Sequence, residues 1–202
     1  MRRLNCDRLV VATHNHGKLA EIAALLAPFG VATLSGEQLG LPAPDETADT
    51  FLGNARIKAH AAAALTLLPA LADDSGLEVA ALGGSPGVMT ADWADGPDGR
   101  DYGKAMRRVW SELKAVKAIE PWEARFRCTL VLAWPDGHEE VFCGDVAGQI
   151  VWPVRGGMGH GFDPIFQPDG FPLTFAEMTG GEKNRISHRA VALRRFLEGC
   201  FG

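Results

Sequence analysis

Two adjacent carboxylates, Asp73 and Asp74, follow the short apolar run Ala70–Ala72 and precede Ser75-Gly76. Neighbouring like charges repel unless hydrogen bonds or a cation offset the repulsion, so such a pair suits metal binding or general-base catalysis. Because successive side chains of an extended strand point to opposite faces, one carboxylate is expected to face a site while the other holds the loop. An ordinary acidic turn closed by Ser-Gly explains the segment equally well.

Glu46 supplies a further carboxylate, in a loop just ahead of a predicted helix that carries Asn54 and Lys58. If the chain brings Glu46 near Asp74, the pair offers the oxygen ligands that Mg²⁺ prefers, with phosphate oxygens and waters completing an octahedron. The alternative needs no metal, because an acidic residue near a helix start stabilises the helix dipole.

A phosphate-binding candidate lies where the first predicted strand gives way to a helix. The segment reads Thr13-His14-Asn15-His16-Gly17-Lys18. Backbone amides and the positive end of the helix dipole favour an anion there, and Lys18 adds a full charge. The segment is not a Walker A loop, because the G-x-x-x-x-G-K-[ST] spacing is missing. A plain turn with a solvated lysine is the alternative.

A donor-rich run stands before the last predicted helix. It reads Glu182-Lys183-Asn184-Arg185-Ile186-Ser187-His188-Arg189. Lys183 and Arg189 could hold phosphate or base oxygens, and His188 could donate to a purine carbonyl. A solvated basic face gives the same run. Thr179 and Glu182 also fit a capping box, with the serine of the run as a competing cap.

A glycine-rich loop is the last candidate. It reads Gly156-Gly157-Met158-Gly159-His160-Gly161-Phe162-Asp163-Pro164. So many glycines let the backbone approach a ligand closely, and Phe162 beside Asp163 could stack on and hydrogen-bond a base. A long hairpin exit would look the same. The chain offers no H-E-x-x-H, no paired cysteine ligands and no G-x-S-x-G elbow, which disfavours a zinc hydrolase and a serine hydrolase.

The elements that must position these residues follow from hydrophobic periodicity. Strands are predicted at 8–13, 31–34, 70–72, 77–82, 126–132 and 140–152, and helices at 19–29, 50–67, 102–116 and 187–198. Strands and helices alternate in the first third, and a hairpin with an Asp-Gly turn follows. The pattern predicts an α/β fold with a mixed sheet flanked by helices.

Composition narrows the class of protein. With 202 residues, 47% hydrophobic and 22% charged, the chain can form one domain over 1–202, built as two closely joined lobes. The net charge is −5 and the charges are scattered, which disfavours a nucleic-acid partner. No apolar run reaches the ~20 residues of a membrane span, and none near the start suits a signal peptide. The four cysteines read as reduced thiols, so a soluble, cytoplasmic protein is expected.

Taken together, the motifs resemble the inosine and xanthosine triphosphate pyrophosphatase family along nearly the whole chain. In order they are Ala12-Thr13-His14-Asn15-His16-Gly17-Lys18, Glu46-Thr47 with Thr50-Phe51, Asn54-Ala55 with Lys58-Ala59, Ala72-Asp73-Asp74-Ser75-Gly76-Leu77, Pro86-Gly87-Val88, Gly161-Phe162-Asp163-Pro164-Ile165-Phe166, Glu182-Lys183-Asn184 and Ile186-Ser187-His188-Arg189. Each motif alone is weak, whereas all eight in this order do not recur by chance.

The resemblance implies a homodimer of two-lobed α/β subunits with a nucleotide cleft between the lobes. It implies Mg²⁺-dependent hydrolysis of ITP, dITP and XTP to monophosphate and pyrophosphate. Glu46 and Asp74 would hold the metal, and Asp74, Asp73 and Lys18 would form the catalytic group. The substrate would contact Thr13, His14, Asn15, His16, Gly17 and Lys18 at the triphosphate, Lys58 and Ser75 beside them, and His160, Gly161, Phe162, Asp163, Lys183, His188 and Arg189 around the purine and its sugar.

Several positions depart from the family pattern. Members typically read Pro-Gly-Val-Tyr-Ser-Ala-Arg-Tyr, whereas this chain reads Pro86-Gly87-Val88-Met89-Thr90-Ala91-Asp92-Trp93. Asp92 reverses the charge of an arginine. Gly53 stands where a glutamate is common, and a histidine replaces the phenylalanine ahead of the Gly161 motif. These departures keep two alternatives open, a pyrophosphatase for pyrimidine or modified nucleotides and a nucleotide-binding protein without turnover.

Overall fold

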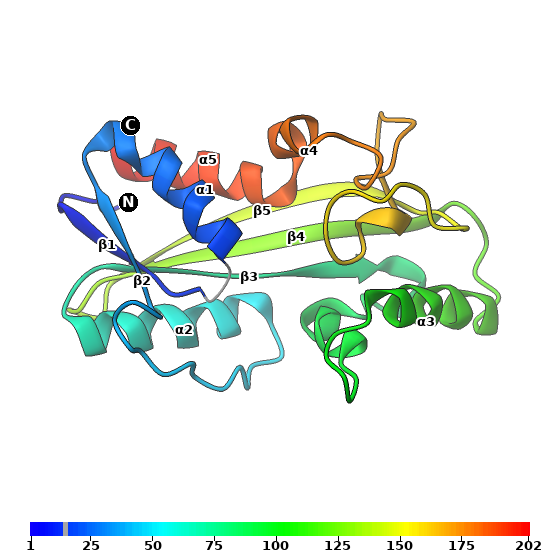
Figure 1. The fold of residues 1–202 in the computed structure, drawn as a ribbon, viewed down its shortest axis with the longest axis horizontal. Coiled ribbons are helices and arrows are strands. Elements are labelled where there is room, and N and C mark those ends of the chain that lie inside the picture. The colour runs from blue at the N-terminus through cyan, green and yellow to red at the C-terminus, as the bar shows by residue number, and fades with distance from the viewer. Residues whose placement is uncertain (14–15) are drawn as a thin grey trace. The chain divides into compact units, whose positions relative to one another are not determined.

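A computed structural model of the chain describes residues 1–13 and 16–202 and contains a six-stranded sheet in the order β2-β1-β3-β4-β5-β6 (Figure 1). The strands are β1 (Arg8–Val11), β2 (Ala32–Ser35), β3 (Ala70–Val79), β4 (Trp122–Ala133), β5 (Glu139–Ile150) and β6 (Phe166–Pro168). β1 pairs in parallel with β2 and β3, whereas β5 and β6 are antiparallel. The predicted mixed α/β sheet is confirmed.

Five α-helices accompany the sheet in the described part of the chain. They are α1 (His16–Leu26), α2 (Phe51–Thr66), α3 (Tyr102–Ala115), α4 (Gly180–Ile186) and α5 (His188–Phe201). None of the helices over 1–13 and 16–202 is long and apolar enough to cross a membrane. The chain divides into two compact units. The first comprises Met1–Asp74, Thr129–Cys143 and Ala192–Gly202, and the second comprises Ser75–Cys128 and Gly144–Val191.

The first unit has helices on both sides of its strands. α2 lies on one side, and α1 lies on the other together with the C-terminal part of α5 (Figure 1). α2 packs through small side chains, because Ala55, Ala59 and Ala62 are buried against Val10 and Ala72. Small residues let a helix backbone approach the sheet closely. The start of α2 is thereby held close to the strand that carries the acidic pair.

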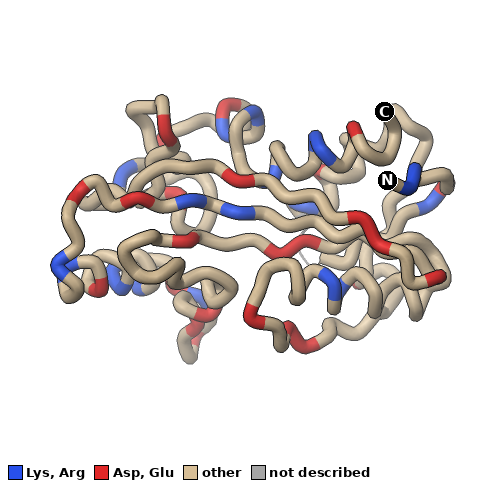
Figure 2. The backbone as a smooth tube through the Cα atoms, turned by 180° about the vertical axis from the view of Figure 1, so that it is seen from behind, with Lys and Arg blue, Asp and Glu red and all other residues tan. Residues whose placement is uncertain are grey.

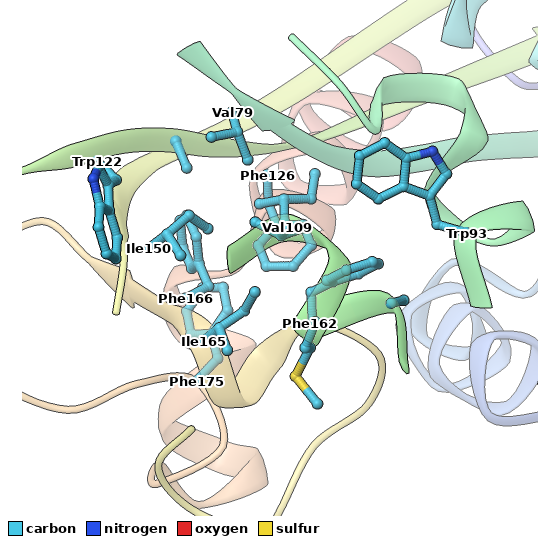
Figure 3. Packing of buried hydrophobic residues seen from close by; sticks show 14 of the residues in the cluster. Val79, Trp93, Val109, Trp122, Phe126, Ile150, Phe162, Ile165, Phe166 and Phe175 are labelled. Atoms are coloured by element: carbon cyan, nitrogen blue, oxygen red, sulfur yellow. The ribbon is translucent and has the colours of Figure 1, made fainter. Parts of the chain in front are cut away.

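The second unit is built on aromatic side chains. Phe126, Phe162, Phe166 and Phe175 lie in one buried cluster with Val109 of α3 (Figure 3). The rings of Phe126 and Phe166 meet edge to face, with centroids 4.7 Å apart. Such pairs contribute about 0.5–1.5 kcal/mol beyond the burial of their area. This cluster supports the segment that carries the glycine-rich loop.

The open face of the second unit's strands carries paired charges. Arg127 of β4 bonds to Asp145 of β5 at 2.7 Å and lies 3.8 Å from Glu78 of β3, which Arg125 also contacts. Figure 2 shows basic and acidic segments interleaved along these strands. The two arginines and two carboxylates cancel in net charge, so this part of the surface is neither basic nor acidic.

One sequence prediction about the strands is wrong. Ala70–Ala72 and Leu77–Leu82 are not separate strands, because β3 runs unbroken through the acidic pair, and residues 80–82 form a 3-10 turn. A strand tolerates two adjacent carboxylates when each meets a partner on its own face. Asp73 pairs with Lys18, and Asp74 accepts a hydrogen bond from Asn54. The carboxylates therefore sit on a rigid strand rather than in a turn.

The two helix caps predicted as alternatives, Thr179 with Glu182 and Ser187, both occur, and each caps a different helix. Thr179 and Glu182 form a capping box that starts α4, and Ser187 accepts a hydrogen bond from the Ala190 amide at 3.2 Å as α5 begins. The sequence prediction of one helix from 187 missed α4. Lys183 consequently lies on a helix of its own, separate from the helix that carries His188.

Cys200 offers a check on the packing of the first unit. Its side chain is 1% exposed, and burial raises the pKa of the thiol to about 12. Since the thiolate is the nucleophile, only about one molecule in 10⁴ is reactive at pH 8. We expect iodoacetamide to spare Cys200 in the folded protein and to modify it in guanidinium chloride, as read by peptide mass spectrometry. Equal labelling rates in the two states would contradict the packing.

Candidate active site

The structure places the predicted site residues in two groups, one in each unit. The first unit carries Thr13, Gly17, Lys18, Glu46, Lys58, Asp73 and Asp74, and the second carries Ser75, His160, Gly161, Phe162, Asp163, Lys183, His188 and Arg189. His14 and Asn15 lie outside the described residues. His16 begins α1, and Gly17 is exposed in its first turn.

Lys18 and Asp73 form an ion pair in the first unit. The Lys18 ammonium, in the first turn of α1, lies 2.6 Å from a carboxylate oxygen of Asp73, whose side chain is 8% exposed. At this burial the attraction is screened less than at the surface. The pair fixes the lysine close to the end of β1, where the predicted phosphate-binding segment begins.

Asp74 points to the opposite side of β3. Its carboxylate accepts a hydrogen bond from Asn54 of α2 at 3.2 Å, whereas the partner of Asp73 comes from α1. α1 and α2 lie on opposite sides of the sheet (Figure 1). The expected alternation of the two carboxylates is thus confirmed. Asp74 lies on the same side as the helix that follows the Glu46 loop.

Glu46 and Lys58 form a second ion pair. The Lys58 ammonium lies 3.1 Å from a carboxylate oxygen of Glu46, and the two side chains are 16% and 45% exposed. Both residues line a small cavity with Thr13, together with apolar side chains of the preceding loop and of α2. Its volume of about 60 Å³ admits a few water-sized groups rather than a nucleotide.

Sequence reasoning missed Asn54 as a site residue, although it bonds to both of the segments that carry the candidate metal ligands. Its amide nitrogen donates to Asp74, and its amide oxygen accepts from the backbone of Ala48 at 2.9 Å, two residues beyond Glu46. The available signal was a lone asparagine, 4% exposed, among the alanines of α2. Buried amides are retained where their hydrogen bonds are satisfied.

The donor set of the first unit suits a hard divalent cation. Glu46 and Asp74 offer carboxylate oxygens, and no described group of three or more His, Cys, Asp or Glu side chains forms a closed metal site. Mg²⁺ is commonly held by one or two carboxylates plus substrate phosphates and water. Two carboxylates therefore fit Mg²⁺ better than a zinc site of nitrogen and sulfur ligands.

In the second unit, Asp163 is the centre of a buried polar cluster. It is 2% exposed, contacts the Lys183 ammonium in an ion pair, and accepts a hydrogen bond from the His160 amide at 2.6 Å. A Cβ on Gly159 would lie 2.2 Å from the Asp163 carboxylate, and the φ of Gly159 is +83°. Only glycine allows this close approach of the loop. The glycine-rich loop is therefore folded around Asp163.

The ring of Phe162 does not occupy the position expected for base stacking. It is 1% exposed and lies in the aromatic core of the second unit (Figure 3). Packing of neighbouring rings around it leaves no face for a base. Tyr102 meets Phe162 edge to face at 5.9 Å and His160 at 5.4 Å. Within this group of rings Tyr102 is partly exposed and His160 is exposed. The sequence did not single out Tyr102, because it reads as part of the apolar stripe of α3.

The remaining predicted residues lie on two elements. The ring of His188 stacks on Phe126 with centroids 4.9 Å apart and an interplanar angle of 12°, and the residue is 8% exposed. Arg189 follows it in α5 and is partly exposed, and Ser75 is partly exposed on β3. The stacking orients the His188 imidazole so that its ring nitrogens lie in a defined plane.

The segment that departs from the family pattern is anchored to β3. Residues 87–94 form two 3-10 turns, and the Thr90 hydroxyl accepts a hydrogen bond from the Leu77 amide at 3.0 Å. Met89 and Asp92 are exposed, whereas Trp93 is buried beneath the Arg108 guanidinium, 3.8 Å from its ring centroid. The substitutions at Met89 and Asp92 thus alter the surface, and Trp93 fills the core.

Comparison with known proteins places this geometry in a family. Residues 9–199 match the Ham1 family. A dITP/XTP pyrophosphatase from Ruegeria pomeroyi is 58% identical over 201 residues, which cover 100% of this chain and 98% of that protein. A HAM1 protein from Coxiella burnetii has a solved structure with a TM-score of 0.91 and 35% identity, over 96% of this chain and 98% of that one. A nucleoside-triphosphatase, dITP/XTP pyrophosphatase, from Mycobacterium abscessus aligns with a TM-score of 0.78 and 36% identity, over 94% of this chain and 98% of that one.

Proposed function

Because this chain belongs to the Ham1 family, we propose that it hydrolyses the non-standard purine nucleoside triphosphates ITP, dITP and XTP to the monophosphate and pyrophosphate. The observation that carries the proposal is the arrangement in the first unit. Asp74 on β3 is hydrogen-bonded to the same asparagine as the loop of Glu46, and each of the helices α1 and α2 carries a lysine that is paired with a carboxylate of this group. Carboxylates and lysines in this combination serve metal-assisted cleavage of phosphoanhydrides.

In this proposal Asp74 accepts the proton of the water that attacks the α-phosphorus. A bond forms between the water oxygen and the α-phosphorus, the α–β anhydride bond breaks, and the electron pair leaves with pyrophosphate. Lys18 and Lys58 bind the oxygens of the departing group, and Asp73 orients Lys18. Mg²⁺ held by Glu46 and Asp74 would neutralise phosphate charge. Thr13, Gly17 and Ser75 complete the phosphate contacts.

The group in the second unit recognises the base in the same proposal. Lys183, His188 and Arg189 are donors, and Asp163 pairs with Lys183 and accepts from the backbone of His160. Donors directed at the 6-oxo group favour hypoxanthine and xanthine. Adenine presents an amino group at that position, which would leave donors facing donors. The main chain of Phe162 belongs to this group, while its ring serves the core.

The assembly and location of the protein belong to the proposal as well. We propose one catalytic domain over 1–202 that includes both compact units, a homodimer and a cytoplasmic location. The proposal of a dimer rests on the family resemblance, and that of the cytoplasm on the four cysteines without a paired motif.

Pyrophosphate release from a panel of ITP, XTP, dITP, ATP, GTP, dUTP and dTTP tests the function. We expect release confined largely to ITP, XTP and dITP, with Mg²⁺ present and abolished by EDTA, because cleavage needs both the metal and the base contacts. Release of inorganic phosphate instead of pyrophosphate would contradict attack at the α-phosphorus. Equal rates with ATP would contradict the proposed base selection.

A second candidate function rests on two specific residues. His160 stands where a phenylalanine is common in the resembling family, and the exposed Asp92 stands where an arginine is common. These changes favour a pyrophosphatase for pyrimidine or otherwise modified nucleotides. The same panel decides between the two, because preferential turnover of dUTP or dTTP would support the second candidate. Nucleotide binding without release of either product would favour a binding protein.

A further inference from the structure

Asn54 occupies an unusual place for a polar side chain. It lies in the first turn of α2 and is 4% exposed, whereas the other buried residues of this helix are Phe51 and alanines. A buried amide without partners would destabilise the fold, so its hydrogen bonds explain its presence. Both ends of the amide have a partner, and each partner belongs to a segment that carries a candidate metal ligand.

The orientation of the amide follows from these partners. The backbone N–H of Ala48 can only donate, so the group that it meets at 2.9 Å is the Asn54 oxygen. The nitrogen must then face Asp74, where it donates to the carboxylate at 3.2 Å. A single side chain thus fixes the loop that follows Glu46 and the rotamer of Asp74.

The loop itself lies tightly against the start of α2. The Thr50 hydroxyl accepts from the backbone N–H of Gly53 at 3.1 Å, and the backbone N–H of Asn54 donates to the Thr50 carbonyl at 3.1 Å. A Cβ on Gly53 would come within 2.4 Å of the Ala48 Cβ. The loop therefore has little room to shift, and the hydrogen bond from the Ala48 N–H to the Asn54 side chain ties it to this turn.

We propose that Asn54 is a positioning residue that holds Glu46 and Asp74 in mutual register for a divalent cation, an inference that rests on the proposed function. Asn54 touches neither the nucleotide nor the reacting atoms in this account. It acts through Asp74, by donating to one carboxylate oxygen, and through Ala48, by anchoring the loop of Glu46. Outer groups of this kind orient the ligands of a metal and tune its affinity.

Two substitutions separate the roles of the amide. Asn54→Leu keeps the number and branching of the side-chain heavy atoms and removes both hydrogen bonds. Asn54→Asp keeps an oxygen to accept from Ala48 and places a second carboxylate against Asp74, so that the loop stays anchored while Asp74 is repelled. Thr50→Ala is the matched control, because it removes the cap of the same helix turn without touching Asp74.

The measurements are the Mn²⁺ affinity without nucleotide, by calorimetric titration, the kcat and KM for ITP, and the melting temperature. We expect Asn54→Leu to weaken Mn²⁺ binding about 10–100-fold and both Asn54 variants to lower kcat by a similar factor. KM for ITP should change less than about threefold, because the phosphate-binding lysines are untouched. Thr50→Ala should lower the melting temperature while Mn²⁺ affinity and kcat stay near those of the wild type.

The outcomes separate the inference from the function on which it rests. Folded Asn54 variants with the kcat and Mn²⁺ affinity of Thr50→Ala would overturn the positioning role. A wild type that binds Mn²⁺ but hydrolyses no nucleotide would overturn the proposed function, and the Mn²⁺ affinities of the variants would still decide the role of Asn54. A wild type that hydrolyses ITP but binds Mn²⁺ neither alone nor with a non-hydrolysable ITP analogue would overturn the positioning role and leave the function standing.

Discussion

Asp74→Asn should lower the turnover of ITP by about 10³-fold, the largest effect that we expect from one substitution. The amide has the shape of the carboxylate and keeps an oxygen that accepts from Asn54. It cannot take up a proton from water, and it carries no charge for a cation. The melting temperature should therefore stay within a few degrees of the wild type while catalysis is lost.

Pyrophosphate release with saturating ITP and Mg²⁺ measures this effect. Asp98→Asn serves as the control, because Asp98 is exposed in a loop of the second unit and takes no part in the proposed site. If Asp74→Asn kept more than about a tenth of the wild-type rate, general-base catalysis by Asp74 would be excluded, since such catalysis is commonly worth at least ~10²-fold.

Lys183→Met should destabilise the protein by about 2 kcal/mol, the largest effect on stability that we expect at the site. Asp163 is 2% exposed, and loss of the lysine leaves a buried carboxylate without its counter-ion. The lysine side chain is 20% exposed, so the loss stays below that of a fully buried pair. Methionine keeps the length of the apolar stem, which limits the loss of packing.

A double-mutant cycle with Asp163→Asn identifies the cause. The double variant should be more stable than Lys183→Met alone, because the uncompensated charge is gone, with a coupling energy of about 1 kcal/mol or more. Urea unfolding of the four proteins gives the values, and Arg185→Met on the exposed face of α4 controls for loss of a cation. Additive effects of the two substitutions would mean that the pair contributes no mutual stabilisation.

Local signals in the sequence sufficed for most of the fold. Alternation of apolar strands and amphipathic helices predicted the mixed sheet, and the helix predicted at 50–67 closely matches α2. The interruption of β3 was predicted wrongly, because charge was read as a turn signal. The partners that make Asp73 and Asp74 acceptable within a strand come from 55 and 20 residues away, which no local pattern reveals.

The sequence predicted which residues belong to the candidate site, but not the contacts that each of them makes. Motifs selected Lys18, Glu46 and Asp74, and the structure gives each a partner that the motifs did not specify. Asn54 stood out only as a lone asparagine among alanines, because its hydrogen bonds to the Ala48 backbone and to the Asp74 side chain cannot be read from the sequence. The ring of Phe162 was assigned to the base, yet packing buries it, since aromatic residues serve a core as readily as a ligand.

The absence of a side chain at position 53 has a consequence for how this site can vary. Because a Cβ there would overlap that of Ala48 at 2.4 Å, the two positions are sterically coupled, and the coupling extends to the loop that carries Glu46. A larger residue at 53, such as the glutamate common in the resembling family, requires a different path for that loop. Replacing this loop with the loop of another family member would thus require residues 48 and 53 to be exchanged together.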